Sequence, residues 1–118
     1  MAIQIKRAYD PVSNEDGTRY LIDRLWPRGK SKADLAIDGW LKDLAVSDAL
    51  FRGYHHDQAK WPEFRDKYRA ELAAKESAWR PLLGRARTGE VTLVFAAKDS
   101  EHSNAAVLKE FLDERLTE

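Results

Sequence analysis

Cysteine is absent from this sequence of 118 residues, and its absence removes several kinds of chemistry at once. A chain without cysteine forms no disulfide, offers no thiolate nucleophile and gives no cysteine ligand to a metal. We therefore expect any activity of the chain to be independent of thiols. The lack of cysteine is also compatible with a reducing, cytoplasmic setting.

Long apolar runs and an excess charge of either sign are missing as well. No stretch approaches the roughly 20 apolar residues that a helix needs to span a bilayer. The first residues lack the apolar core of a secretory signal, so we expect a cytoplasmic protein with no membrane partner. The 20 basic and 20 acidic residues cancel, which disfavours nucleic acid as a partner because it attracts basic surfaces.

Familiar catalytic and nucleotide-binding motifs are missing too. The six glycines are scattered, so they form neither a P-loop nor a dinucleotide fingerprint. No serine lies in a Gly-x-Ser-x-Gly motif, which argues against a serine hydrolase. The three histidines show none of the spacings of zinc sites. We predict neither a metal nor a cofactor.

What the sequence does contain is an alternation of strand and helix patterns. Three segments are typical of strands, with alternating or continuous apolar side chains: residues 2–8, 18–23 and 91–97. Helical patterns begin after Ser31, after Ser47 and at Pro62, recur over Pro81–Arg87, and return over 107–116. This order predicts a small single-domain α/β fold over residues 1–118. We expect a three-layer sandwich with a mainly parallel sheet and helices on both faces.

The segment Ile37–Ala45 fits two structures. Its apolar residues recur at helical spacing, which favours a helix. Gly39 weakens a helix, however, and Lys42 and Asp43 also fit a strand that reaches a charged edge of the sheet. The residues alone leave both alternatives open.

Polar side chains gather where predicted strands end, and in parallel sheets that edge is where ligands bind. The candidates are Asp23, Arg24, Arg28 and Lys30 after the second strand, His56 in a polar turn, and Asp99, His102 and Asn104 after the strand over 91–97. We expect the three loops to converge.

The basic residues in this set suit an anion. Each arginine offers a planar fork of donors that matches a phosphate or carboxylate, so Arg24, Arg28 and Lys30 could form an anion pocket. The alternative is that Arg24 pairs with Asp23 or Asp43 while the other two are solvated.

The acidic and imidazole side chains have catalytic and structural interpretations. Asp23 could act as a general base with a pKa raised by burial, or as a structural partner for Arg24 or loop amides. His56, next to Asp57, could act as an acid–base group, or could cap a helix or form hydrogen bonds in the core. Asn104 could orient a ligand or cap the last helix.

The run Asp-Arg-Leu-Trp-Pro-Arg-Gly at 23–29 resembles the signature of the DUF488 family, in its short YeaO-like branch. Weaker matches extend over nearly the whole chain: Lys6–Pro11, Trp40–Ala45, His56-Asp57 with Trp61, Phe64 and Tyr68, and Val91–Leu108. The resemblance implies a family of unknown function and a strand over Ile37–Ala45. Phe95 and Ser103 stand where the longer branch carries cysteines, so thiol chemistry proposed for that branch cannot operate here.

Together these patterns predict a cytoplasmic domain that binds a small anionic ligand at the carboxyl edge of its sheet. If the chain is an enzyme, its side chains suit a thiol-independent hydrolysis or group transfer, with Asp23 and His56 as the catalytic residues. The rival interpretation is a non-catalytic protein-interaction or regulatory module.

Overall fold

The computed structural model describes residues 2–54 and 57–117, which form an α/β fold around a four-stranded sheet. The strands are β1 (Ile3–Arg7), β2 (Thr18–Leu21), β3 (Gly39–Trp40) and β4 (Val91–Phe95). They lie in the order β1-β4-β2-β3, and every neighbouring pair is parallel. The predicted α/β fold with a parallel sheet is confirmed. All four carboxyl ends therefore lie at the same edge.

β4 occupies a central position, and each of its residues is buried. Val91 lies opposite Ile3 of β1 on one side and opposite Thr18 of β2 on the other. Because neighbouring strands and packed layers cover it on every side, apolar side chains fill nearly all of its positions. The polar exception is Thr92, whose hydroxyl donates a hydrogen bond to the Asp16 carbonyl at 2.6 Å.

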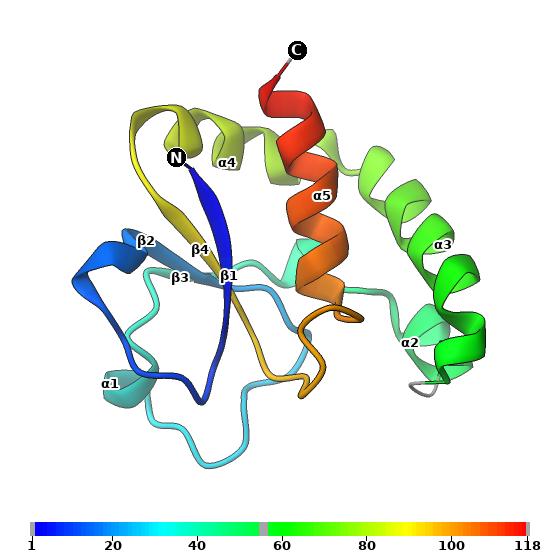
Figure 1. The fold of residues 1–118 in the computed structure, drawn as a ribbon, viewed down its shortest axis with the longest axis horizontal. Helices are drawn as coiled ribbons and strands as arrows, with labels where there is room; N and C mark the ends of the chain where they lie inside the picture. The colour runs from blue at the N-terminus through cyan, green and yellow to red at the C-terminus, as the bar shows by residue number, and fades with distance from the viewer. Residues whose placement is uncertain (1, 55–56, 118) are drawn as a thin grey trace.

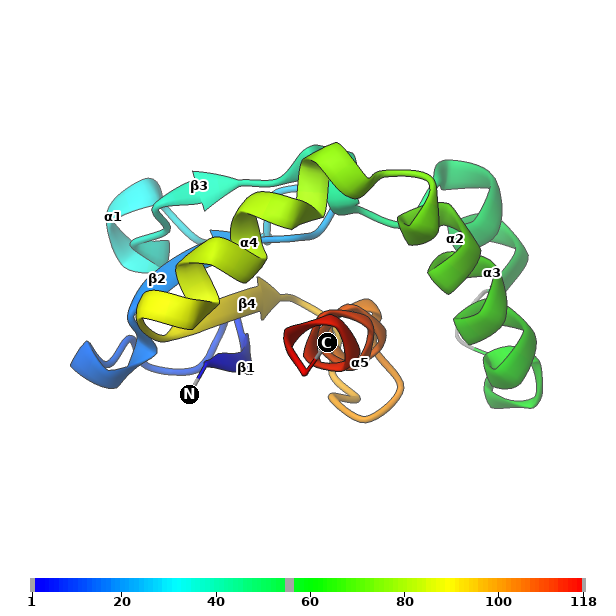
Figure 2. The same ribbon diagram turned by 90° about the horizontal axis from the view of Figure 1, so that it is seen from above.

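Longer helices cover one face of the sheet. α4 (Glu76–Thr88) and α5 (Asn104–Leu116) contact β4, and α5 also contacts β1. α3 (Trp61–Ala73) packs on the far side of α5, and α2 (Asp48–Tyr54) packs on α3. Figures 1 and 2 both show α5 between the sheet and α3. In the described part of the chain, no helix is long and apolar enough to cross a membrane.

The opposite face is covered more thinly, by α1 (Lys32–Leu35) and the loop between β1 and β2. Side chains of β4 alternate between two cores: Leu93 and Phe95 join the larger one under the long helices, and Val94 joins a smaller one with Leu35. The α1 helix begins with the predicted capping box at Ser31, whose hydroxyl accepts the Asp34 N–H at 3.1 Å. Helical cover on both faces is thus confirmed.

A buried ion pair fastens the loop between β1 and β2 to the thinner face. Asp16 accepts hydrogen bonds from Arg19 at 2.6 Å and from Lys6 at 2.7 Å. The same arginine also donates to the Leu35 carbonyl through two nitrogens, at 3.2 and 2.9 Å. Every donor and acceptor named here has a partner, so the cluster is structural.

The segment Ile37–Ala45 is neither a full strand nor a helix. A strand forms, as the resemblance implied, but β3 is limited to two residues and gives way to a 3₁₀ turn over Lys42–Leu44. Gly39 lies against the Tyr20 ring, and a Cβ there would come within 3.2 Å of it. The glycine that weakens a helix therefore has a packing role beside β2.

α4 extends beyond the predicted piece over Pro81–Arg87. It begins at Glu76, and its first turns include Trp79, whose Nε1 donates to the Leu72 carbonyl at 2.7 Å and whose ring packs edge-on against Phe111 of α5. The helix ends at Gly89 as expected, although this glycine has an extended backbone with φ of 177°.

Candidate functional site

A cavity of about 360 Å³ opens at the carboxyl edge of the sheet. The loops after β2 and β4 and the beginning of α5 form most of it, and side chains of α2 and α3 complete it. Of the predicted site residues, the cavity is lined by Asp23, Arg24, Arg28, His102 and Asn104. Two of the three loops that we expected to converge therefore meet here.

Asp23 links three elements at the inner part of this site. Its Oδ2 accepts the Ala96 N–H, just after β4, at 2.9 Å, and its Oδ1 accepts the Asn104 amide at 2.9 Å. Its carbonyl accepts the Trp40 indole N–H at 2.7 Å. Burial raises the pKa of the Asp23 carboxyl, and the two hydrogen bonds to its oxygens oppose that rise. The carboxylate thus bonds a loop amide, as its structural interpretation predicted.

Arg24 turns the other way, toward α2. Its Nη2 lies 2.9 Å from a carboxylate oxygen of Asp48, and both side chains are exposed to solvent. The same carboxylate also contacts Arg52 at 3.1 Å. The alternative in which Arg24 pairs with Asp23 or Asp43 is wrong, and the Asp23 carboxylate instead accepts hydrogen bonds from Ala96 and Asn104. An exposed pair of this kind is weak, so Arg24 can exchange its partner for a ligand.

Arg28 is exposed and lines the same cavity. Its carbonyl accepts the Tyr9 hydroxyl at 3.0 Å. Within residues 2–54 and 57–117, its guanidinium has no hydrogen bond or ion pair. The loop that carries it turns at Gly29, which has a positive φ of 81°. This conformation suits glycine. Arg28 thus presents a guanidinium beside the cavity that no described residue pairs with.

Lys30 lies outside the cavity lining. Its ammonium sits 5.7 Å from the centre of the Tyr9 ring, in a cation–π contact. Its carbonyl accepts the Trp26 indole N–H at 2.5 Å. Lys30 therefore helps to hold the loop and adds positive charge beside Tyr9, which lines the cavity.

His102 and Asp99 form a pair next to the cavity. The imidazole Nδ1 lies 2.8 Å from an oxygen of Asp99, and the ring packs edge-on against Trp61. The hydrogen bond from His102 lowers the pKa of the Asp99 carboxyl. Asp99 itself is exposed and outside the lining. Asp99 therefore orients the His102 imidazole through Nδ1, and the Nε2 atom of the ring stays available for other contacts.

Asn104 does not cap α5. The cap is Ser103, whose hydroxyl accepts the Ala106 N–H at 3.1 Å, while the Asn104 amide donates to Asp23. Capping by Asn104 was therefore the wrong alternative. Its side-chain carbonyl has no hydrogen bond with any described residue, so an acceptor remains at the inner part of the site.

His56, the second predicted catalytic residue, lies outside the described residues. Among those that are described, no group of three or more His, Cys, Asp or Glu side chains is placed to hold a metal ion. Sequence reasoning missed the apolar lining residues, among them Tyr9, Leu25 and Phe51. Tyr9 follows β1, so the expectation that ligands bind beyond the carboxyl ends of parallel strands could have identified it. Phe51 comes from α2, and no local pattern points to it.

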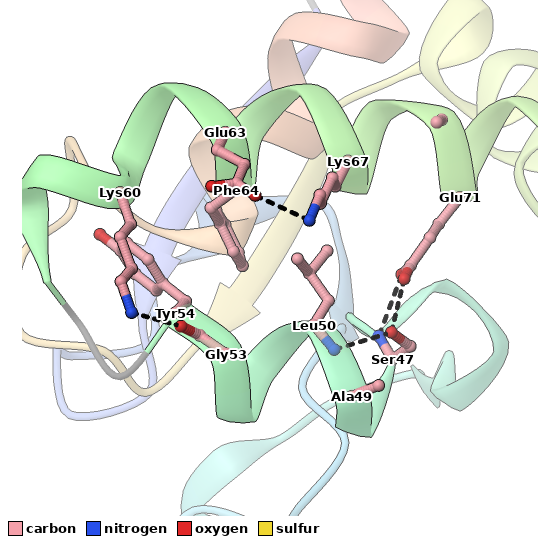
Figure 3. A pocket seen from close by; sticks show the side chains of 11 residues that line it. Ser47, Ala49, Leu50, Gly53, Tyr54, Lys60, Glu63, Phe64, Lys67 and Glu71 are labelled. Atoms are coloured by element: carbon pink, nitrogen blue, oxygen red, sulfur yellow. Dashed lines mark hydrogen bonds and ion pairs between the residues drawn. The ribbon is translucent and has the colours of Figure 1, made fainter.

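A larger hollow of about 650 Å³ lies between α2 and α3. Figure 3 shows Leu50 and Phe64 pointing toward one another across it. Its charged groups are already paired: Lys67 lies 2.7 Å from Glu63, and Glu71 accepts hydrogen bonds from the Ser47 N–H and hydroxyl. This groove is a junction between helices, and it offers fewer unpaired polar groups than the cavity at the sheet edge.

Comparisons with known proteins identify the family of the chain and leave its activity open. Uncharacterized protein YeaO of Escherichia coli K12 is 42% identical over 112 residues, covering 95% of this chain and 97% of that protein. Uncharacterized protein Rv3073c of Mycobacterium tuberculosis H37Rv is 37% identical over 115 residues, covering 96% and 95% respectively. No solved structure gives a significant match. The model of the inactive DUF488-N3 subclade matches residues 2–118, and the chain therefore belongs to the DUF488 family.

Proposed function

We propose that the cavity at the carboxyl edge binds a small anionic ligand carrying a phosphate or carboxylate group. The observation that carries this proposal is the pair of arginines on its wall: Arg28 has no side-chain partner among the described residues, and Arg24 is in a weak, exposed ion pair. A guanidinium donates two parallel hydrogen bonds to such a group. The proposal extends to Lys30, whose ammonium lies beside the Tyr9 ring that lines the cavity.

The charge balance of the chain indicates that an anion would be attracted by the arginines of the site and not by the protein as a whole. The chain has no net charge, so the protein as a whole exerts little long-range pull on an anion. The ligand would displace Asp48 from Arg24 and add the unpaired Arg28 fork, exchanging one exposed ion pair for two charge-assisted contacts. Such contacts strengthen where a concave site removes water.

Binding without catalysis is the form of this proposal that we favour. The matching family model is described as an inactive subclade, and both oxygens of Asp23 already accept hydrogen bonds from the protein. Hydrolysis or group transfer with Asp23 or His56 is the catalytic alternative. A protein-interaction or regulatory module is the non-catalytic rival. The cytoplasmic location stays a prediction.

A screen of phosphate- and carboxylate-bearing metabolites, read out by thermal unfolding, tests the proposal. We expect at least one compound to raise the Tm of the wild type and to leave Arg28→Ala unchanged. Arg87→Ala removes an equal charge from the exposed end of α4, so it should respond as the wild type does. If no compound raises the Tm of the wild type, the result favours the protein-interaction module over the anion site.

A further inference from the structure

Exposed apolar side chains concentrate around the same cavity. The described part of the chain has four large hydrophobic residues that are strongly exposed: Leu25 at 68%, Val12 at 46%, Phe51 at 45% and Tyr9 at 42%. All of these except Val12 line the cavity. Exposing apolar surface to water is unfavourable, and its concentration on one concave site indicates that a ligand covers it.

The polar groups at the inner and outer ends of the cavity differ in whether they accept or donate hydrogen bonds. Asp23 and Asn104 are half-buried, just after β2 and at the beginning of α5. Each Asp23 oxygen already accepts one hydrogen bond and keeps a second lone pair, and the Asn104 carbonyl has no partner among the described residues. Arg24 and Arg28 are exposed, and both offer only donors. A ligand that satisfies both regions carries hydrogen-bond donors at its inner end and negative charge at its outer end.

The volume of the cavity limits the kind of ligand that fits it. The cavity volume of about 360 Å³ lies near the lower end of the roughly 300–1,000 Å³ that is usual for small-molecule sites. An inorganic anion held by the arginines would leave the apolar walls uncovered. A ring system joined to the anion would cover Tyr9, Leu25 and Phe51, because aromatic and aliphatic side chains pack well on planar rings.

We propose that the ligand is a nucleoside monophosphate whose base carries an exocyclic amine. Its phosphate binds Arg24 and Arg28, its base packs against the exposed apolar side chains, and its donor groups face Asp23 and Asn104. This inference rests on the proposed function, because it names the ligand class of the same site. It adds the claim that the ring contributes to binding independently of the phosphate.

Calorimetric titration with AMP, ribose 5-phosphate, adenosine and inorganic phosphate separates the two contributions. We expect AMP to bind at least about tenfold more tightly than each of the other three. Leu25→Ser and Phe51→Ala should weaken AMP binding and leave the affinity for ribose 5-phosphate unchanged. Val12→Ser is the matched control, since it removes an exposed apolar side chain outside the cavity.

The outcomes distinguish this inference from the proposal on which it rests. If ribose 5-phosphate binds as tightly as AMP, and Arg28→Ala weakens both, the anion site stands and the role of the base is overturned. If adenosine binds as tightly as AMP and Arg28→Ala has no effect, the arginines hold no anion and both proposals fail. Absence of binding by AMP also overturns the nucleotide inference.

Discussion

Burial of the Asp23 carboxyl has a consequence for stability that depends on pH. Its pKa is raised above the ordinary value of 3.8 by desolvation, so the folded state binds this proton more tightly than the unfolded chain does. The contribution of Asp23 to stability is therefore largest at low pH, and it is lost as pH rises through the raised pKa.

Asp23→Asn should remove this dependence. An asparagine stays neutral, and its amide can still bond Asn104 after that side chain flips, so we expect the variant to fold. The free energy of unfolding of the variant minus that of the wild type should increase as pH rises from about 4 to about 7. Urea unfolding at several pH values measures this difference. A difference that stays flat or falls would show that the folded state does not favour the protonated carboxyl.

Asp16 provides the second prediction at the residue scale, because it neutralises a buried arginine. Both members of the Asp16–Arg19 pair are almost fully buried. Removing one partner leaves a buried charge unpaired, so Asp16→Ala should lower the free energy of unfolding by about 3–5 kcal/mol. Asp113→Ala breaks the exposed pair with Lys109 and should cost less than about 1 kcal/mol. Equal losses in the two variants would contradict the structural role of the buried pair.

At the scale of elements, the turn into β2 depends on a glycine. Gly17 has a positive φ of 64°, and a Cβ there would lie 2.2 Å from the Glu90 carbonyl oxygen. That carbonyl accepts the Thr18 N–H at 3.0 Å, which begins the pairing of β2 beside β4. The close approach of the two chains therefore requires the absence of a side chain.

Gly17→Ala should destabilise the fold by more than about 1 kcal/mol, since it adds both strain and a clash with backbone. Gly84→Ala is the matched control within α4, where a Cβ meets nothing within 4 Å. We expect that variant to gain about 0.5–1 kcal/mol, because alanine favours helix. Thermal and urea unfolding of both variants checks the pair. Stabilisation by Gly17→Ala would show that the turn has another conformation.

Elements with a strong local pattern could be predicted from the sequence. The continuous apolar run became β4, and the capping box at Ser31 began α1, since both depend on neighbouring residues. The extent of β3 and the beginning of α4 could not, because both lie at tertiary contacts that no local pattern reports: Gly39 lies against the Tyr20 ring, and Trp79 packs against Phe111.

Some features of the candidate site could likewise be predicted from the sequence, and others could not. The rule for parallel sheets correctly indicated which edge holds the polar loops. The pairing of Asp23 with Asn104 joins residues 81 positions apart, and no local pattern reports such a contact. The partner of Arg24 was likewise missed, because the choice between Asp48 and nearer acids depends on how α2 packs.

At the scale of the whole molecule, the architecture separates stability from binding. The long helices and the larger core lie on one face of the sheet, while Arg24, Arg28 and most of the exposed apolar side chains gather at its carboxyl edge. The buried ion pair lies on the other face and does not line the cavity. Substitutions at the arginines should therefore change binding with little effect on folding.

Residue-resolved NMR titration of the wild type with AMP tests the location of the binding site most directly. We predict that the largest changes in backbone amide shifts fall in three segments: residues 23–28, 96–97 and 102–104. The same titration of Arg28→Ala should show these changes only at much higher AMP concentrations. Shift changes centred on the groove between α2 and α3, or an unaltered response in Arg28→Ala, would contradict a binding site at the carboxyl edge of the sheet.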